Sequence, residues 1–285
     1  ATVVVVASRP EVLREWGASS PGGVEAFALA TVSGAVVLAG ADNRGAIFGA
    51  YHFAEHVLGI DPLYYWTDQV VEARPSIELP AGWAMSGQPA TFRFRGWFMN
   101  DEDLLVGWGR DREGQSAIDL QVWDVIYETI LRCKGNMVIP GTFVFSDEPA
   151  VRLAGRRGLI ISQHHCEILG TNTFRWPKDE EFSFVRNRRA VEAAWQNSVV
   201  TYGDQEMIWT VGYRGLTDRA FWFDDPGVAE TDAERGKVIS DAIARQVEIV
   251  KKFRKDPIII WNAWDEGVAL WEAGHLMIPE GITVV

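Results

Sequence analysis

Hydrophobic positions in the first third of the chain form short apolar runs and one helical pattern. A β-branched run lies near the start, two further runs flank Ser33-Gly34, and a later segment keeps apolar residues at a 4-3-4 spacing. Gly59 follows that segment, where glycine commonly ends a helix. The predicted elements are strands at 2–7, 26–33 and 35–40 and a helix at 42–58. We expect a small α/β domain over residues 1–85.

A segment rich in proline and glycine, 73–89, contains the predicted domain boundary. Beyond it, apolar strand patterns alternate with amphipathic helix patterns at 119–133 and 233–253, and Thr231 with Glu234 forms the sequence of a capping box. The predicted strands are 92–100, 136–141, 159–164, 207–213, 257–263 and 281–285. Alternating strands and helices imply a parallel sheet covered by helices.

The spacing of these strands predicts a (β/α)8 barrel of the TIM type over residues 86–285. Successive strands start roughly 38 residues apart, and a barrel of about 250 residues needs about 31 per unit. Six βα units fit into the chain. Because six strands would leave two open edges, we expect the barrel to be incomplete at the C-terminus, with the missing segment supplied by the parent protein. An open, doubly wound sheet is the alternative.

Composition narrows the classes of function. The chain has 285 residues, 47% hydrophobic and 23% charged, as is typical of soluble globular proteins. A net charge of −12 argues against a nucleic-acid partner, and without an apolar run of 18 residues we expect no membrane span. The two cysteines form neither a disulfide framework nor a zinc signature, and no signal-peptide pattern opens the sequence. We expect no metal or other cofactor.

The chain contains 13 tryptophans, many beside polar residues. Examples are Trp66, Trp97, Trp176, Trp222, Trp261 and Trp264. Indole rings fill cores and interfaces, and they also stack on sugar rings. Composition alone leaves both interpretations open.

Polar residues follow four of the predicted strands directly, at the end of a barrel where active sites lie. They include Asn100, Asp101 and Glu102 after the first strand, His164, His165, Cys166 and Glu167 after the third, Tyr213 and Arg214 after the fourth, and Asn262, Asp265 and Glu266 after the fifth. Each strand must exit into water, so one such end means little. Four ends with this chemistry indicate one site.

Paired carboxylates are what glycoside hydrolysis needs, and Asp101 and Glu266 could flank a glycosidic bond. They could also be a solvated loop acid and an acid favoured in the first turn of a helix. Arg214 is a candidate for gripping a ligand carboxylate, or for a structural salt bridge. Tyr213 could bind the same ligand or merely pack.

The histidines at the third strand end also invite a metal interpretation. Adjacent residues of a strand point to opposite faces, so we expect at most one of His164 and His165 to face the site. The chain lacks a His-Glu-x-x-His helix, and nothing marks Cys166 as a nucleophile. We favour hydrogen-bonding roles for His165 and Glu167, and burial for His164.

Seven segments, in order over almost the whole chain, resemble glycoside hydrolase family 115, the xylan α-glucuronidases. They are ADNRGAIFGAY (41–51), PLYYWTD (62–68), RGWFMNDE (95–102), LRCKGN (131–136), HHCE (164–167), TVGYRG (210–215) and WDE (264–266).

The resemblance implies an N-terminal α/β domain and a catalytic barrel that removes 4-O-methyl-glucuronic or glucuronic acid, α-1,2-linked to xylose, by inversion and without metal. Asp101 and Glu266 would be the catalytic carboxylates, and Arg214 would hold the uronic carboxylate. Substrate-binding roles would fall to Asn100, Glu102, His165, Glu167, Tyr213, Arg214, Trp97 and Asn262.

The partner would be glucuronoxylan or an aldouronic oligosaccharide, the protein would be secreted or periplasmic, and a homodimer is one expected assembly. Two other interpretations stay open. The chain could be a carbohydrate-binding fragment without turnover, or a related barrel hydrolase acting on another sugar, such as a β-hexosaminidase-like enzyme.

Overall fold

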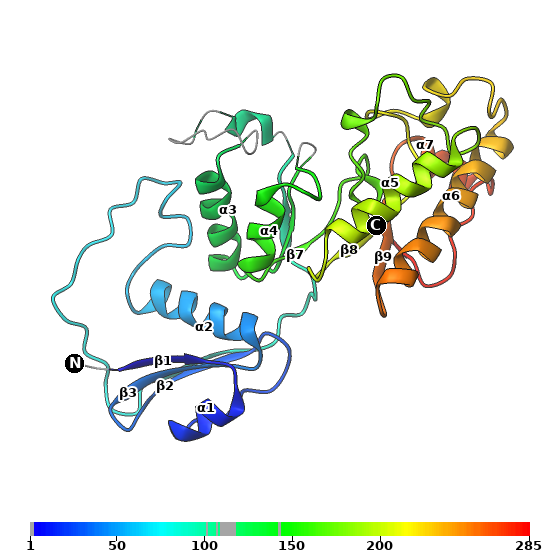
Figure 1. Cartoon of the computed structure of the whole chain (residues 1–285). Coiled ribbons are helices and arrows are strands. Elements are labelled where there is room, and N and C mark those ends of the chain that lie inside the picture. Colours follow the sequence, from blue (N-terminus) through cyan, green and yellow to red (C-terminus); the bar gives the residue numbers. More distant parts are fainter. Residues whose placement is uncertain (1–2, 101, 107, 109–117, 142–143) are drawn as a thin grey trace. The chain divides into compact units, whose positions relative to one another are not determined.

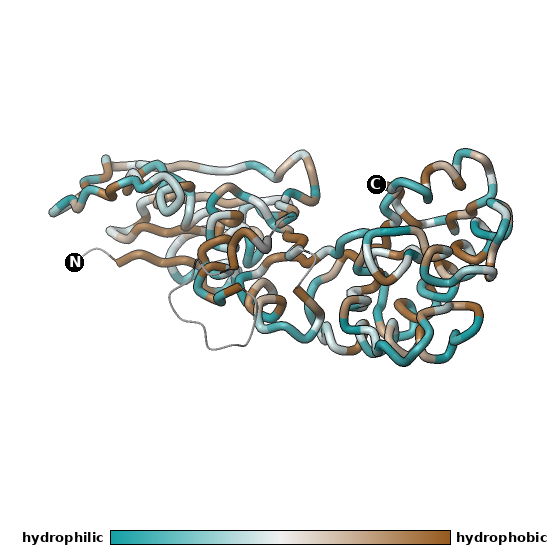
Figure 2. Tube along the Cα trace, turned by 90° about the horizontal axis from the view of Figure 1, so that it is seen from above, coloured by the Kyte–Doolittle hydropathy of each residue, from teal (hydrophilic) through white to brown (hydrophobic). Residues whose placement is uncertain are grey.

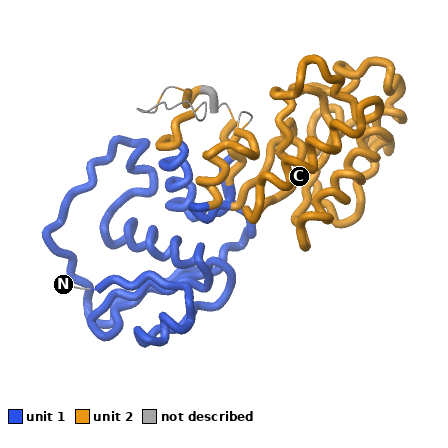
Figure 3. The backbone as a smooth tube through the Cα atoms, in the orientation of Figure 1, with its two compact units in different colours: residues 1–97, 123–137, 156–159 blue, residues 98–122, 138–155, 160–285 orange. Residues whose placement is uncertain are grey.

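The computed structural model describes residues 3–100, 102–106, 108, 118–141 and 144–285. The chain divides into two compact units (Figure 3). Unit 1 comprises residues 1–97, 123–137 and 156–159, and unit 2 comprises residues 98–122, 138–155 and 160–285. The boundary passes through two strands, β5 (Gly96–Phe98) and β6 (Met137–Ile139).

Unit 1 contains a four-stranded sheet of order β1-β3-β2-β4. Its strands are β1 (Val4–Ala7), β2 (Phe27–Val32), β3 (Ala35–Gly40) and β4 (Ala84–Gly87). β3 runs parallel to β1 and antiparallel to β2, so the predicted hairpin is confirmed. Ser33 and Gly34 make its turn with φ values of 51° and 82°, as a tight hairpin turn requires. β4 lies inside the segment predicted as a boundary loop, where its pairing with β2 extends the sheet.

Two helices cover β3 on opposite faces (Figure 1), which explains why all six of its residues are buried. On one face, Leu13 of α1 (Pro10–Glu15) packs against Val37 and Ala39. On the other lies α2 (Asn43–His56). The edge strand β1 is hydrophobic throughout its length (Figure 2), and Val4 and Val6 are about half exposed.

Helix α2 begins and ends where its sequence predicts. The carboxylate of Asp42 accepts a hydrogen bond of 2.8 Å from the backbone N–H of Gly45, which satisfies one of the unpaired amides of the first turn. After the last turn, Gly59 adopts a φ of 73°, the left-handed conformation that suits glycine.

A buried carboxylate joins distant segments of unit 1. Glu25 is 6% exposed and accepts hydrogen bonds from Arg44 Nε at 2.9 Å, Arg95 Nη2 at 2.7 Å and Asn136 Nδ2 at 2.8 Å. Both carboxylate oxygens therefore have charged or amide partners within the protein. Removing a carboxylate so enclosed would leave its buried partners uncompensated, which marks it as a structural group and not a ligand site.

All six strands predicted after residue 86 are present. Besides β5 and β6 they are β7 (Ile160–Ile161), β8 (Ile208–Val211), β9 (Ile258–Trp261) and β10 (Thr283–Val284). They form two three-stranded sheets, β5-β6-β7 and β8-β9-β10, and both pairings in the second are parallel. A parallel bridge between Ile161 and Met207 connects the sheets. The described residues do not close into a barrel.

Helices accompany these strands. They are α3 (Leu120–Arg132), α4 (Pro149–Arg156), α5 (Arg188–Thr201), α6 (Asp232–Phe253) and α7 (Glu266–Glu272). α5 and α6 pack against each other in unit 2 (Figure 1). The predicted capping box opens α6, because Thr231 Oγ1 accepts from the Glu234 N–H and Glu234 Oε2 accepts from the Thr231 N–H.

The fold class is therefore mixed α/β, as predicted. The barrel and the domain limits at residues 85 and 86 stay predictions. Within the described ranges, no helix has both the length and the hydropathy needed to cross a bilayer.

Candidate functional site

The segments that follow β7, β8 and β9 bring polar side chains together in unit 2. His165 comes from the first segment, Arg214 and Asp218 from the second, and Trp264 and Glu266 from the third. β8 and β9 are parallel neighbours, so their carboxyl ends meet at one edge of the sheet. The ends of these strands thus bring the side chains together, and their role as one functional site stays a prediction.

Arg214 and Glu266 form a bidentate ion pair. Arg214 Nε donates to Glu266 Oε1 at 2.8 Å, and Nη2 donates to Oε2 at 2.9 Å. The two side chains are 9% and 14% exposed, so water screens the pair little. Burial lowers the pKa of Arg214, but the hydrogen bonds and charges of Glu266 and Asp218 together outweigh it and raise that pKa. The guanidinium is therefore charged, and it fixes the orientation of the Glu266 carboxylate.

Asp218 contacts the remaining side of the same guanidinium. Its Oδ1 accepts from Arg214 Nη1, and it lies 3.0 Å from Nε2 of His165. Burial raises the pKa of Asp218, but hydrogen bonds from Cys166, Arg214 and His165 hold it below the ordinary value. At 56% exposure, Asp218 is the solvent-facing member of the cluster.

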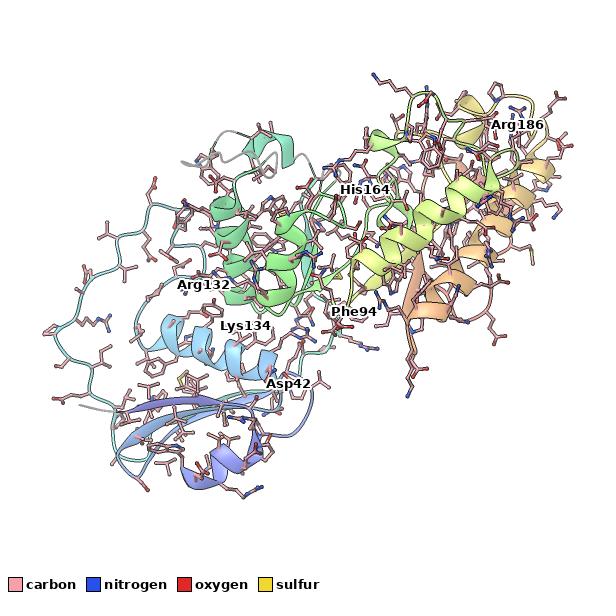
Figure 4. All side chains as sticks on the ribbon, in the orientation of Figure 1. Asp42, Phe94, Arg132, Lys134, His164 and Arg186 are labelled. Atoms are coloured by element: carbon pink, nitrogen blue, oxygen red, sulfur yellow. The ribbon has the colours of Figure 1, made fainter. Side chains whose placement is uncertain are left out.

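Aromatic rings form one side of the cluster. The His165 ring stacks on Trp264 at a centroid distance of 4.6 Å and an angle of 22°. His164 lies 3.9 Å from His165 and 4.7 Å from Phe98, between centroids (Figure 4). Half of the Trp264 side chain is exposed, so its indole can contact a sugar face.

Burial lowers the pKa of both histidines. For His165, burial is the largest effect, and burial and the charge of Arg214 together exceed the opposing effects of Asp218 and Glu266. For His164, burial and then the neighbouring His165 lower the pKa to about 4. Both imidazoles are consequently neutral at pH 7.

The expectation that His164 and His165 point to opposite sides is wrong, because their rings are in contact. β7 ends at Ile161, and His165 already lies in a turn, so the alternation of a strand no longer applies.

A small cavity of about 30 Å³ lies at this cluster. Its lining includes His165, Tyr213, Arg214, Asn262, Trp264 and Glu266, six of the residues that the sequence singled out. That volume holds about one water molecule. A sugar ring must therefore contact the exposed rim formed by Trp264 and Asp218.

Other predicted site residues are not placed at the cluster. Asp101 lies outside the described residues, and so does the side chain of Glu102, which begins a short 3-10 helix (Glu102–Leu105). Asn100 is exposed beyond β5, and Trp97 in β5 belongs to unit 1. The proposed pairing of Asp101 with Glu266 stays a prediction.

Tyr213 and Glu167 are buried. Tyr213 is 3% exposed, its hydroxyl accepts a 2.8 Å hydrogen bond from the Phe184 N–H, and its ring packs among aromatic side chains. The packing alternative left open for Tyr213 thus matches its position. Glu167 is 5% exposed, just before the 3-10 helix Ile168–Gly170. Their roles in binding stay predictions.

Sequence reasoning missed Asp218. It lies four residues after Arg214 in a loop that folds back, where the Gly215 N–H donates to Arg219 O and the Leu216 N–H to Asp224 Oδ2, both at 2.8 Å. The available signal was an acid shortly after the arginine that ends a strand. Loop acids are common, so that signal is weak.

Comparison with known families decides the affiliation. The protein-family model described as "Glycosyl hydrolase family 115" matches residues 87–285, well over half of the chain. The chain belongs to glycosyl hydrolase family 115. No curated protein matches it in a separate comparison.

Solved structures place this family 115 chain among known folds. It matches a family 115 4-O-methyl-α-glucuronidase, described as specific for decorated arabinogalactans, with a TM-score of 0.85 and 23% identity, over 99% of this chain and 39% of that one. A mutant Streptomyces plicatus β-hexosaminidase in complex with its product matches with a TM-score of 0.56 and 11% identity, over 100% and 64%. A β-N-acetylhexosaminidase from Streptomyces coelicolor A3(2) matches with 0.54 and 12%, over 100% and 65%.

These likenesses show the fold alone. The chain spans less than two thirds of the length of each of these structures, and 39% of the family 115 glucuronidase.

Proposed function

We propose that the chain carries an α-glucuronidase site that releases glucuronic or 4-O-methyl-glucuronic acid, α-1,2-linked in a polysaccharide, by an inverting single displacement. Membership of family 115 and the fold likeness to a 4-O-methyl-α-glucuronidase support the proposal. The observation that carries it is the bidentate contact of Arg214 with Glu266 at the ends of two neighbouring parallel strands.

In this proposal Glu266 is the general base. Its carboxylate accepts two hydrogen bonds from the charged Arg214 guanidinium, which fix its orientation. A general base must be ready to accept a proton, and a carboxylate paired with a positive charge fits that role. Glu266 removes a proton from the attacking water, and the opposite carboxyl group protonates the leaving sugar oxygen. Asp101 is the proposed acid. Inversion places the two carboxyl groups about 6.5–9.5 Å apart.

Arg214 has enough donors to contact Glu266 and a uronate carboxylate at the same time. The Nε–Nη2 edge holds Glu266, whereas Nη1 donates to Asp218, a carboxylate on an exposed loop. A ligand carboxylate that replaces Asp218 would meet the geometry that guanidinium prefers. We therefore propose that Nη1 is the recognition point for the acidic sugar and that Asp218 occupies it in the free protein.

The polysaccharide of the proposal is glucuronoxylan, and its oligosaccharides are aldouronic acids. The related glucuronidase is described as specific for decorated arabinogalactans, so both polymers belong in the test. Because such polymers lie outside cells, we propose a secreted or periplasmic protein.

One coarser proposal concerns the fold. The strand order follows the chain order in both three-stranded sheets, and a parallel bridge joins them, as in one continuous barrel wall. We propose that these strands belong to a (β/α)8 barrel, which requires two further βα units.

The experiment incubates the purified protein with glucuronoxylan and with decorated arabinogalactan, and follows the released uronic acid by proton NMR. The proposal expects the β-anomer first, since inversion changes the configuration of an α-linkage. Early release of the α-anomer would contradict the mechanism, and no release from either polymer would contradict the activity.

A matched pair of variants tests whether Arg214 recognises the uronate carboxylate. Arg214→Ala is expected to lose the preference for a glucuronosyl over a neutral glucosyl substrate, because Nη1, the proposed donor to the uronate carboxylate, is gone. Arg189→Ala, an exposed arginine on α5, is the control and should keep it. An unchanged preference in Arg214→Ala would contradict the proposed recognition of the uronate carboxylate by Arg214.

One observation favours a binding role without turnover. The described cavity holds about one water, while Trp264 offers a half-exposed indole stacked on His165. A carbohydrate-binding site could consist of that rim alone. Glucuronic acid that binds with a Trp264-dependent affinity, in a protein that releases no sugar, would support this alternative. Arg214 argues against a neutral-sugar hydrolase of the hexosaminidase kind.

A further inference from the structure

Helix α2 of unit 1 places three potential metal ligands on one face. Glu55 and His56 follow His52 by three and four residues, which are the spacings of neighbours on a helix surface. One ligand atom of each lies within 4.8 Å of the others. The two imidazole centroids are 4.1 Å apart, so the rings already share one small region.

The surroundings hold these groups in position while leaving them accessible. The His52 ring packs against Phe27 at a centroid distance of 5.0 Å, which restricts its rotation. His56 is 45% exposed, and Glu55 Oε2 lies 3.8 Å from its Nε2.

We propose that His52, Glu55 and His56 bind a divalent transition-metal ion such as Zn²⁺, with water completing the coordination. Imidazole nitrogen and carboxylate oxygen are ligands that Zn²⁺ prefers, and three protein ligands plus water make a tetrahedral site. The inference goes beyond the proposed function and does not depend on it, because the helix belongs to unit 1 and the glucuronidase residues to unit 2.

The spacing His-x-x-Glu-His is also that of a zinc peptidase helix, in which the glutamate is the base. Such a site needs a further protein ligand in place of that glutamate. Within the described part of the chain, no other histidine, cysteine or carboxylate joins this group of three. The arrangement therefore suits binding of an ion and not peptide hydrolysis.

A second group of possible ligands, His164, His165 and Cys166, is less suited to a cation. His164 Nδ1 accepts from the Cys166 N–H at 3.1 Å, and His165 pairs with Asp218. The Arg214 guanidinium lies 3.9 Å from the Cys166 sulfur, so an ion there would face a fixed positive charge. This difference favours the group on α2 as the metal-binding site.

Lys134 is the natural competitor at the α2 site. Its Nζ lies 3.6 Å from Glu55 Oε2 (Figure 4), so an entering ion must displace an ammonium group. Replacing Lys134 should therefore tighten metal binding. Because Lys134 has a φ of 62°, asparagine is the replacement that keeps the backbone conformation.

The test titrates the metal-free protein with Zn²⁺ by calorimetry, and with paramagnetic Ni²⁺ while the imidazole proton resonances are recorded. The wild type should bind one ion at α2, and Ni²⁺ should broaden the resonances of His52 and His56 first. His56→Gln should lose that binding, and Lys134→Asn should tighten it by up to about fivefold, the size of an exposed ion pair. His275→Gln and Cys166→Ala are the controls and should keep it.

Several results would overturn the proposal. They are a wild type that binds neither ion, binding that survives in His56→Gln, or binding that disappears in Cys166→Ala instead. Circular dichroism of each variant separates loss of the site from loss of the fold. Should His56→Gln fail to fold, His52→Gln and the Ni²⁺ broadening pattern decide between the two groups.

Discussion

Unit 1 and unit 2 each hold a glutamate that is paired with arginine, and the two clusters differ in what surrounds them. Glu25 is 6% exposed and is enclosed by Arg44, Arg95 and Asn136, all from unit 1. Glu266 is 14% exposed and lies beside a small cavity, with the half-exposed Trp264 next to it. One carboxylate is sealed within the protein and the other borders solvent.

The difference teaches which features separate a structural ion pair from a candidate site. Distances alone do not, because the arginine–carboxylate contacts are 2.7–2.9 Å for Glu25 and 2.8–2.9 Å for Glu266. What distinguishes the second cluster is an exposed partner, Asp218, and an exposed aromatic surface.

The largest effect is expected for Glu266→Gln. An amide cannot take a proton from water, so turnover of a glucuronosyl substrate should fall by about 10³-fold or more, as for loss of a general base. The measurement is the initial rate of uronic acid release. Glu272→Gln, on the same helix, is the control and should keep its rate. A wild-type rate in Glu266→Gln would remove this residue from the mechanism.

Glu25→Gln should affect stability and not chemistry. The change removes the buried negative charge that Arg44 and Arg95 both contact, so the free energy of unfolding should fall by about 3–4 kcal/mol. Urea denaturation measures it, with the exposed Glu15→Gln as control. If stability were unchanged while sugar release was lost, the assignment of the two clusters would be reversed.

Low pH should weaken the protein through His164. Its pKa is about 4 in the folded state, below the unfolded value near 6.5, so between these values the unfolded chain binds the proton and the folded chain does not. The free energy of unfolding should thus fall as pH drops from about 6.5 to about 4, by about 3 kcal/mol in total.

His164→Asn should flatten this dependence, because asparagine can still accept the hydrogen bond from Cys166 N–H and does not titrate. Urea denaturation at a series of pH values provides the measurement, and His275→Gln is the comparison. A slope that persists in His164→Asn would assign the effect to other groups.

The smallest effect is expected for Trp264→Ala. Loss of a half-exposed stacking surface should weaken binding of glucuronic acid by about 1 kcal/mol, or about fivefold, while stability changes little. Calorimetric titration measures the affinity. The matched control is Trp271→Ala on α7, a tryptophan that is 43% exposed and is not among the residues lining the cavity. Equal losses in both variants would argue against a specific sugar platform.

Much of the fold follows from local sequence, because local interactions determine it. The hairpin at Ser33-Gly34, the start of α2 at Asp42 and the capping box at Thr231 each depend on residues a few positions apart, and all are present. The strand ends that converge on Arg214 and Glu266 were predictable because parallel strands share an edge.

The rest depends on contacts that sequence spacing does not encode. β4 lies in a segment rich in proline and glycine, and only its pairing with β2 makes it a strand. Asp218 reaches Arg214 through a loop that folds back, and the contact of His164 with His165 follows from β7 ending early. Tertiary interactions decide each of these.

The enclosure of Glu25 also has a consequence for how the chain matures during synthesis. Its partners Arg44, Arg95 and Asn136 are translated one after another, the last of them 111 positions later. Early strands and helices can form as they leave the ribosome, yet the carboxylate lacks its full set of partners until the third segment arrives. Nascent chains stopped before that point should be cleaved by proteases more readily than slightly longer ones.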